Sequence, residues 1–97
     1  MLKPFVVVFS DAQINRQALL DFLDTRPEVK NWFAFLPSAI FVISDKTATQ
    51  IAEIVRQGFP GKNLFVSEVS RGTNDGWLGG NVWDFINTPN SSGRWPS

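Results

Sequence analysis

The chain contains neither cysteine nor histidine among its 97 residues. Without cysteine there is no disulfide framework and no thiolate metal ligand. Without histidine the chain lacks the commonest zinc ligand, the usual general base near neutral pH, and the Ser-His-Asp and Cys-His catalytic triads. Any chemistry would therefore depend on carboxylates, lysines, hydroxyl groups or the backbone.

The sequence also lacks an excess of charge and a long apolar run. Nine basic and nine acidic residues cancel, which argues against strong non-specific binding to nucleic acid, because such binding usually needs a basic face. The apolar run near the N-terminus, residues 5–9, is too short for a signal peptide. No stretch reaches the roughly 18 apolar residues of a membrane span. We therefore expect a cytoplasmic protein with no membrane partner.

The length and composition predict one small domain. Hydrophobic residues make up 43% of the chain, which is enough to build a single core at this size. We expect this domain to span residues 1–89. The polar ending NSSGRWPS predicts a flexible tail over residues 90–97.

Hydrophobic patterns predict four strands and three helices. β-branched and aromatic residues favour strands at 5–10, 31–36, 39–44 and 63–70. The first of these is a continuous apolar run, which is typical of a strand buried on both faces or lying in the middle of a sheet. Apolar residues at helical spacing favour helices that end near Arg26, at Gly58 and at Asn87.

Polar residues before each helical pattern are candidate N-caps. Ser10 or Asp11 could cap the first helix, and Asp45 or Thr47 the second. For the third helix, over residues 82–87, we expect Asn81 as the N-cap, with Asp84 in the capping-box position.

The order of elements is β-α-β-β-α-β followed by a short C-terminal helix, which predicts an α+β, ferredoxin-like fold. Right-handed crossovers then place both long helices on one face of a four-stranded antiparallel sheet, with strands in the spatial order 4-1-3-2. The other face needs a cover, for which the candidates are the third helix, a second protomer or a ligand.

Several stretches carry a resemblance to a known family. They are VVVFSD, a tryptophan on the second strand, LPSAIFVIS, a T-x-x-Q-I-x-x-I helix and NLFVSEVS, which together cover about two-thirds of the chain. In these stretches the chain resembles the small SinR-like proteins, which are related in fold to the CRISPR-associated adaptation (Cas-two-like) family. The resemblance implies a ferredoxin-like fold and a homodimer made by pairing sheets.

In some members of the wider group the resemblance also implies metal-dependent nuclease activity, with an acidic residue at the end of the first strand. The matching position here is Asp11, which would be catalytic and would bind Mg or Mn. The family's second acidic residue or aromatic partner is absent, because Ser10, Ala12 and Gln13 surround Asp11. Many SinR-like proteins have no established activity.

Asp11 therefore has two interpretations, and Asp45 shares the ambiguity. Asp11 could be one magnesium ligand per protomer, paired across a dimer axis. Alternatively it caps a helix, where its carboxylate accepts hydrogen bonds from free amides. Because the first and third strands are antiparallel neighbours, Asp11 and Asp45 should lie at opposite ends of the sheet.

Glu68 is expected on the same face of its strand as Leu64 and Val66. The fourth strand is predicted at an edge of the sheet, so Glu68 is an edge carboxylate, an interface ion-pair partner, or a charge that prevents strand pairing.

Six phenylalanines of the predicted strands have two interpretations. They could form an exposed platform for stacking RNA bases, or they could supply core and dimer contacts. SAIFVIS lacks the glycine-aromatic pattern of RNA-binding platforms, and few basic residues flank the strands, which favours the second interpretation. The six residues are Phe5, Phe9, Phe33, Phe35, Phe41 and Phe65.

The stretch NDGWLGGNVWDF, residues 74–85, combines two tryptophans with a Gly-Gly pair. It does not match a phosphate-binding loop, because no lysine follows the glycines. We expect a glycine hinge that folds the third helix back, with Trp83 at the edge of a buried stripe. Trp77 is expected in the preceding turn, where it would carry any aromatic ligand site.

Taken together, the sequence predicts a homodimeric interaction module without catalysis and without a cofactor. Its partner would be a protein or a nucleic acid, and its interface candidates are Trp77, Trp83 and Glu68. The alternative is a metal-dependent nuclease of the Cas-two-like type that uses Asp11.

Overall fold

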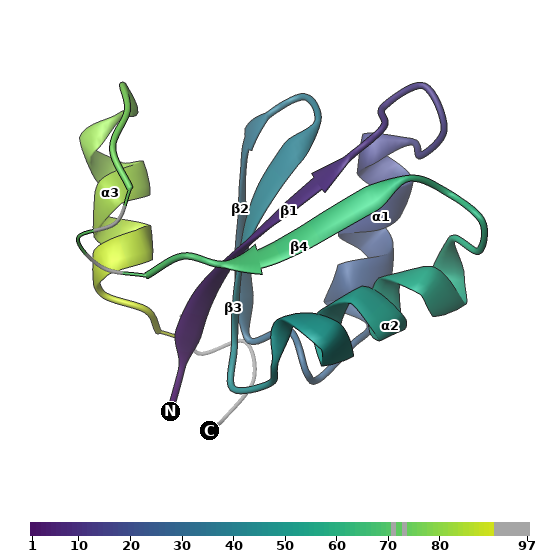
Figure 1. Cartoon of the computed structure of the whole chain (residues 1–97), viewed down its shortest axis with the longest axis horizontal. Coiled ribbons are helices and arrows are strands. Elements are labelled where there is room, and N and C mark those ends of the chain that lie inside the picture. Colours follow the sequence, from purple (N-terminus) through teal and green to yellow (C-terminus); the bar gives the residue numbers. More distant parts are fainter. Residues whose placement is uncertain (71, 73, 91–97) are drawn as a thin grey trace.

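A computed structural model describes residues 1–70, 72 and 74–90 of the chain. The elements follow the expected β-α-β-β-α-β order with an additional C-terminal helix (Figure 1). They are β1 (Lys3–Phe9), α1 (Arg16–Asp24), β2 (Asn31–Leu36), β3 (Ala39–Ser44), α2 (Ala48–Gly58), β4 (Leu64–Glu68) and α3 (Gly80–Asn87). Of the tail expected over residues 90–97, only residue 90 belongs to the described part.

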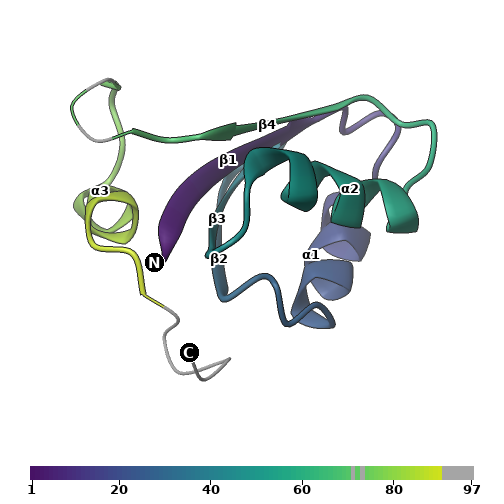
Figure 2. The same cartoon turned by 60° about the horizontal axis from the view of Figure 1, so that its bottom comes forward.

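The four strands form one sheet in the order β2-β3-β1-β4, and all neighbouring strands are antiparallel. Counted from the opposite edge, this is the expected order 4-1-3-2. Helices α1 and α2 cover one face of the sheet, and α3 lies on the other side (Figure 2). The α+β architecture and the antiparallel sheet are therefore confirmed.

The strand bounds agree closely with the hydrophobic pattern. β2 and β3 span the predicted residues, whereas β1 begins at Lys3 and β4 ends at Glu68. In β2 the pairing with β3 is irregular between Ala34 and Leu36. β3 is buried along its whole length because both faces of the sheet are covered there.

The start of α1 differs from the sequence expectation. The helix begins at Arg16, and Asn15 is its N-cap, with its side-chain Oδ1 accepting from the Ala18 backbone N–H at 2.9 Å. The prediction that Ser10 or Asp11 caps this helix is therefore wrong. The physical reason lies in Ile14, which is only 1% exposed: a turn after Ser10 brings it into the core before the helix begins.

The start of α2 matches one of the two predicted alternatives. Thr47 caps the helix and forms a capping box with Gln50, in which each side chain accepts from the backbone N–H of the other residue. Asp45 is exposed, and its Oδ1 lies 3.9 Å from the Lys46 ammonium. The helix ends at Gly58, as expected.

The start of α3 also needs a correction. Gly79 is the N-cap, and no side chain makes a capping hydrogen bond there. Asn81 and Asp84 both lie inside the helix, so neither forms the predicted cap or capping box. The predicted end of the helix at Asn87, just before Pro89, is confirmed.

The main core lies between the sheet and the pair α1 and α2. β1 contributes Phe5, Val7 and Phe9, which alternate along the strand and point to this face. They pack with buried aliphatic side chains from β3, α1 and α2, namely Ile40, Val42, Leu19, Leu20, Leu23, Ile51 and Val55. This layer fixes the position of β1, and through it the position of β4 at the edge.

Candidate functional site

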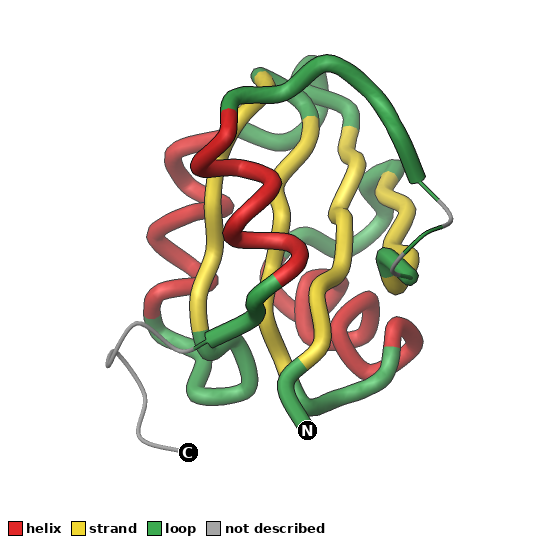
Figure 3. Tube along the Cα trace, turned by 90° about the vertical axis from the view of Figure 1, so that its left-hand side faces the viewer, coloured by secondary structure: helices red, strands yellow, loops and turns green. Residues whose placement is uncertain are grey.

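The face of the sheet opposite α1 and α2 has a covered half and an open half. Helix α3 covers the half formed by β2 and β3 (Figure 3). Its Val82 and Ile86 are buried against Phe41 of β3. The Phe85 ring packs edge-on to Phe33 at 5.6 Å between centroids, as the predicted apolar stripe requires.

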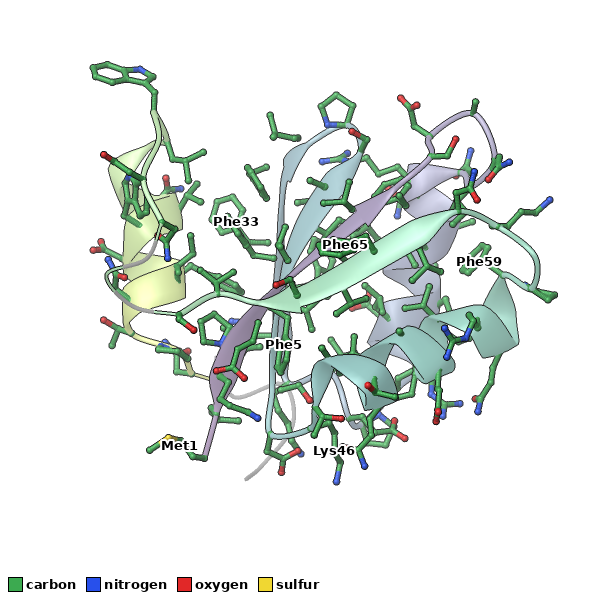
Figure 4. All side chains as sticks on the ribbon, in the orientation of Figure 1. Met1, Phe5, Phe33, Lys46, Phe59 and Phe65 are labelled. Atoms are coloured by element: carbon green, nitrogen blue, oxygen red, sulfur yellow. The ribbon has the colours of Figure 1, made fainter. Side chains whose placement is uncertain are left out.

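In the half formed by β1 and β4, only the end around Val8 and Phe65 is open, because Val6 of β1 and Val69 after β4 pack against the cluster under α3. Val8 of β1 and Phe65 of β4 are direct cross-strand partners, and their exposed fractions are 40% and 63%. Phe65 lies on β4 away from α3, whereas Phe33 lies beside it (Figure 4). We call Val8 and Phe65 the apolar strip. The expectation that the first strand is buried on both faces is therefore wrong at Val8, although β1 does lie in the middle of the sheet.

The two edges of the sheet differ in the hydrogen bonds that their outward backbone groups make. At the β2 edge, side chains bond to backbone groups of the strand. Arg16 of α1 donates from Nη2 to the Ala34 carbonyl at 3.1 Å, and the Asn31 Oδ1 accepts from the Trp32 backbone N–H at 2.9 Å. These bonds occupy two of the backbone groups that another strand would otherwise use, so the β2 edge is partly blocked to pairing.

At the β4 edge, two backbone hydrogen bonds to β1 define which groups face outward. The Val69 N–H donates to the Pro4 carbonyl at 2.9 Å, and the Ser10 N–H donates to the Asn63 carbonyl at 3.2 Å. Backbone groups in an antiparallel pair alternate in direction, so residues 63, 65, 67 and 69 turn theirs toward β1. The backbone N–H and C=O groups of residues 64, 66 and 68 therefore point away from the sheet.

Within the described residues, the backbone groups of this outer row have almost no hydrogen-bond partner. Its one internal partner is the Ser67 hydroxyl, which donates to the Glu68 carbonyl at 3.3 Å. No described strand pairs with this side of β4. The open row and the apolar strip adjoin each other, and together they form the candidate site, which we call the β4 edge.

Glu68 lies at one end of the β4 edge and already has a partner within the chain. Its Oε1 is 3.7 Å from the Lys3 ammonium, and the Glu68 side chain is still 47% exposed. The Lys3 ammonium also lies 5.5 Å from the centre of the Phe5 ring. Exposed ion pairs of this kind add little stability, so Glu68 keeps the capacity to meet a second cation.

Asp11 does not belong to a cluster of metal ligands. It is exposed, on the turn that follows β1. The described part of the chain holds no group of three or more His, Cys, Asp or Glu residues that could bind a metal ion. Lys3, at the other end of β1, pairs with Ser44, so Asp45 and Asp11 lie at opposite ends of the sheet, as expected.

The two tryptophans of the 74–85 stretch have different surroundings. Trp77 is fully exposed in the segment before α3. Trp83 is partly buried against the apolar cluster that Phe41, Val82 and Ile86 form under α3. The helix therefore folds back onto the sheet as expected, with Trp83 in a packing position. Gly80 lies inside α3, and Gly79 has a φ of −62°, which any residue can adopt, so the structure does not show that the glycines act as a hinge. Trp77 is available to a partner.

The predicted stacking platform is divided between buried and covered residues. Phe5 and Phe9 are buried on the face of α1 and α2, and Phe33, Phe35 and Phe41 pack together in the cluster under α3. Only Phe65 presents an exposed ring. The other β1 and β4 side chains on its face, Val6, Val8 and Ser67, carry no charge, so these described strand residues offer no cation to meet a phosphate.

Sequence reasoning missed Val8 and Arg16 as functional candidates. Val8 sits inside the run FVVVF, where nothing distinguishes it from buried neighbours. Arg16 reads as an ordinary exposed helix residue, because its contact with Ala34 exists only once α1 packs beside β2.

None of the described helices is long and apolar enough to cross a membrane. Comparison of the chain with protein-family models, curated proteins and solved structures found no match. The resemblance to SinR-like proteins thus rests on the sequence motifs alone.

Proposed function

We propose that the protein is a homodimeric interaction module with a ferredoxin-like fold, and that it acts by binding through the β4 edge without catalysis. The observation that supports this most directly is the outward row of backbone groups at residues 64, 66 and 68, beside the exposed Phe65. The split β-α-β arrangement of two helices on one face of an antiparallel sheet supports the ferredoxin-like assignment.

Strand addition suits this surface for a physical reason. Backbone hydrogen bonds from an added strand provide affinity, and side chains that alternate between faces provide specificity. Each such bond contributes about 1 kcal/mol net, and burial of Phe65 adds about 1–2 kcal/mol. Association costs several kcal/mol of translational and rotational freedom, which offsets part of this gain. The tests below are therefore designed for a dimer of micromolar affinity, about −8 kcal/mol.

The chemistry of the surface favours a protein over a nucleic acid. Phosphate recognition requires lysine or arginine beside the stacking rings, whereas the side chains around Phe65 on its face are apolar or hydroxylic. α3, at the other side of that face, carries Asp84 and no basic residue. A second copy of the chain and a further protein partner are therefore the proposed ligands, and Trp77 is a candidate anchor for the latter because tryptophan is enriched at interface hot spots.

Light scattering coupled to size exclusion, at tens of micromolar, tests the dimer. We expect the wild-type mass to be that of two chains and Phe65→Asp to weaken the dimer at least about tenfold, since 1.4 kcal/mol corresponds to a factor of ten. Trp77→Asp is the matched control, because it also replaces an exposed aromatic ring by a carboxylate but lies outside the β4 edge. A monomeric wild-type protein contradicts the proposal.

The alternative is a nuclease that uses Asp11 with Mg or Mn. Its support is the position of Asp11 directly after β1 and its exposure to solvent. Incubation of the purified protein with RNA and DNA, with and without either metal ion, tests it. Cleavage that depends on metal and disappears in Asp11→Ala would establish the nuclease, whereas cleavage that survives in Asp11→Ala rules out this role for Asp11.

A further inference from the structure

We infer that two copies pair their β4 strands antiparallel about a two-fold axis beside Phe65, so that each Lys62 faces Glu68 of the second copy. This inference rests on the proposed homodimer and specifies its register. It follows from the directions of the backbone groups and from the side chains that each register would bring together.

Backbone directions limit the registers that can form. Only residues 64, 66 and 68 turn their N–H and C=O groups outward, and an antiparallel pair exchanges bonds only between outward groups. Outward residues must therefore face outward residues of the second copy. The two-fold axis then passes beside a single residue of the strand, and moving it by one residue changes every side-chain pair.

Four of these registers oppose side chains that pair poorly. An axis at Leu64 places Lys62 against Val66 and Asn63 against Phe65. An axis at Val66 places Leu64 against Glu68 and Phe65 against Ser67. An axis at Ser67 places Val66 against Glu68, and an axis at Glu68 places the two carboxylates against each other. Each of these arrangements leaves a charged side chain facing an apolar side chain or a like charge, which destabilises cross-strand pairs.

An axis at Phe65 is the register in which every pair is compatible. It places the two Phe65 rings directly opposite each other, and Leu64 opposite Val66 on the helix-covered face. Phe65 turns its backbone groups toward β1, so its pair across the axis is of the non-hydrogen-bonded type, in which side chains approach most closely. The most exposed apolar side chain of the strand thereby becomes buried by its own copy.

The same register brings Lys62 opposite Glu68 of the second copy. The carbonyl of Asn63 still bonds to β1. The chain therefore keeps the direction of β4 as far back as Asn63, the neighbour of Lys62. Lys62 is exposed, and the described residues provide no ion-pair partner for its ammonium. Glu68 uses only Oε1 to meet Lys3, and its Oε2 can accept the second cation.

This register has a consequence for Asp11. Asp11 follows Ser10, which bonds to Asn63 on the far side of the strand from the axis. With strands about 4.8 Å apart and a rise of about 3.4 Å per residue, the two Asp11 carboxylates lie roughly 20 Å or more apart. A metal site shared by two Asp11 residues is therefore incompatible with the proposed dimer.

A single-cysteine scan tests the register cleanly, because the natural chain has no cysteine. The variants are Leu64→Cys, Phe65→Cys, Val66→Cys and Ser67→Cys, each oxidised mildly as the full-length protein. A disulfide needs Cα atoms about 4.4–6.8 Å apart. Two copies of the same residue come this close only at the axis, so Phe65→Cys should cross-link fastest. A mixture of Lys62→Cys and Glu68→Cys proteins should form a mixed disulfide even if Phe65→Cys weakens the dimer.

The outcomes separate the register from the dimer itself. Fastest cross-linking of Leu64→Cys, Val66→Cys or Ser67→Cys, or no mixed disulfide between Lys62→Cys and Glu68→Cys, overturns the register and leaves the dimer standing. A dimer that cross-links at none of these positions overturns pairing through β4. A monomeric wild-type protein by light scattering removes the proposed function, and the register with it.

Charge reversal provides an independent measurement. Lys62→Glu should weaken the dimer roughly two- to tenfold, because two exposed ion pairs are lost by symmetry. Lys62→Glu combined with Glu68→Lys should recover part of that loss. Lys46→Glu, which changes the charge equally on a lysine beside Asp45, should leave the affinity unchanged. If Lys46→Glu weakened the dimer equally, the effect would come from net charge, and the specific pair of Lys62 with Glu68 would be overturned.

Discussion

At the scale of single residues, Ser44 stands out because it is the one buried polar residue of the described part of the chain. It is fully buried at the end of β3. Its hydroxyl donates to the Glu28 carbonyl at 2.6 Å and accepts from the Lys46 backbone N–H at 3.1 Å. One side chain thus ties the segment before β2 to the segment before α2.

We predict that Ser44→Ala lowers the free energy of unfolding by about 2 kcal/mol, because two buried backbone groups lose their partner. Urea denaturation followed by tryptophan fluorescence measures this loss. Ser38→Ala is the control, since Ser38 contributes its backbone carbonyl to a bond with Phe9 and alanine retains that group. Equal effects of the two substitutions would mean that the Ser44 hydroxyl contributes nothing specific.

Gly58, the last residue of α2, is required by a neighbouring ring. A Cβ atom placed there would lie 2.7 Å from Cε1 of Phe22. The Phe22 ring is itself held edge-on to Phe59, at 5.7 Å between centroids. The ring cannot move aside without losing that contact, so the absence of a side chain at Gly58 reflects packing rather than backbone conformation.

Gly58→Ala should therefore destabilise the protein by about 1 kcal/mol, even though alanine is favoured over glycine in a helix by a similar amount. Gly80→Ala is the matched control: Gly80 begins α3, and an added Cβ meets nothing within 4 Å. Thermal unfolding of both variants distinguishes the two cases. A stabilised Gly58→Ala protein would show that Phe22 repacks freely.

At the scale of elements, helix starts depend on more than local sequence. Thr47 and Gln50 form a reciprocal cap that involves only neighbouring residues, so sequence reasoning could include it among its alternatives. The start of α1 is set by the burial of Ile14 in the core, and α3 starts at a glycine without a side-chain cap. Local capping preference therefore wrongly predicted Ser10 or Asp11 and Asn81 as N-caps.

This difference predicts unequal costs of two similar substitutions. Thr47→Ala should lower the free energy of unfolding by about 1 kcal/mol, the usual cost of losing a side-chain cap. Asn81→Ala should change it by less than about 0.5 kcal/mol, because Asn81 lies within α3 and makes no cap. Chemical denaturation of both variants provides the comparison. A large loss in Asn81→Ala would restore Asn81 as the cap.

The elements themselves were predictable because their signals are local. β2 and β3 follow from dense β-branched and aromatic patterns, and the strand order follows from right-handed crossovers. The candidate site was less accessible to sequence reasoning. Glu68 was identified at the edge strand, but the exposure of Val8 and the bond from Arg16 to Ala34 arise only after helices pack. Edges and open faces are tertiary properties, and no periodicity encodes them.

At the scale of the whole molecule, unfolding and association should be linked. If the folded chain forms a dimer and the unfolded chain does not, the midpoint temperature of unfolding rises with protein concentration. We predict this rise for the wild-type protein between about 1 and 100 micromolar, where a micromolar dimer changes its occupancy. Differential scanning calorimetry measures it.

Phe65→Asp should reduce this concentration dependence while leaving the low-concentration midpoint nearly unchanged, because the Phe65 side chain is mostly exposed in the single chain. A midpoint that is independent of concentration in the wild-type protein would contradict the dimer. A large drop at low concentration in Phe65→Asp would show that the ring supports the monomer.

The bonds of Arg16 and Asn31 along β2 also bear on how large an assembly can grow. A sheet with two usable edges adds copies end to end without limit, and such growth leads to fibres. Here side chains of the same chain occupy two backbone groups of the β2 edge, which makes that edge a poorer template than β4. For the proposed dimer this favours an assembly of two chains, so Arg16 would disfavour polymerisation although it lies on the opposite side of the sheet from the proposed interface.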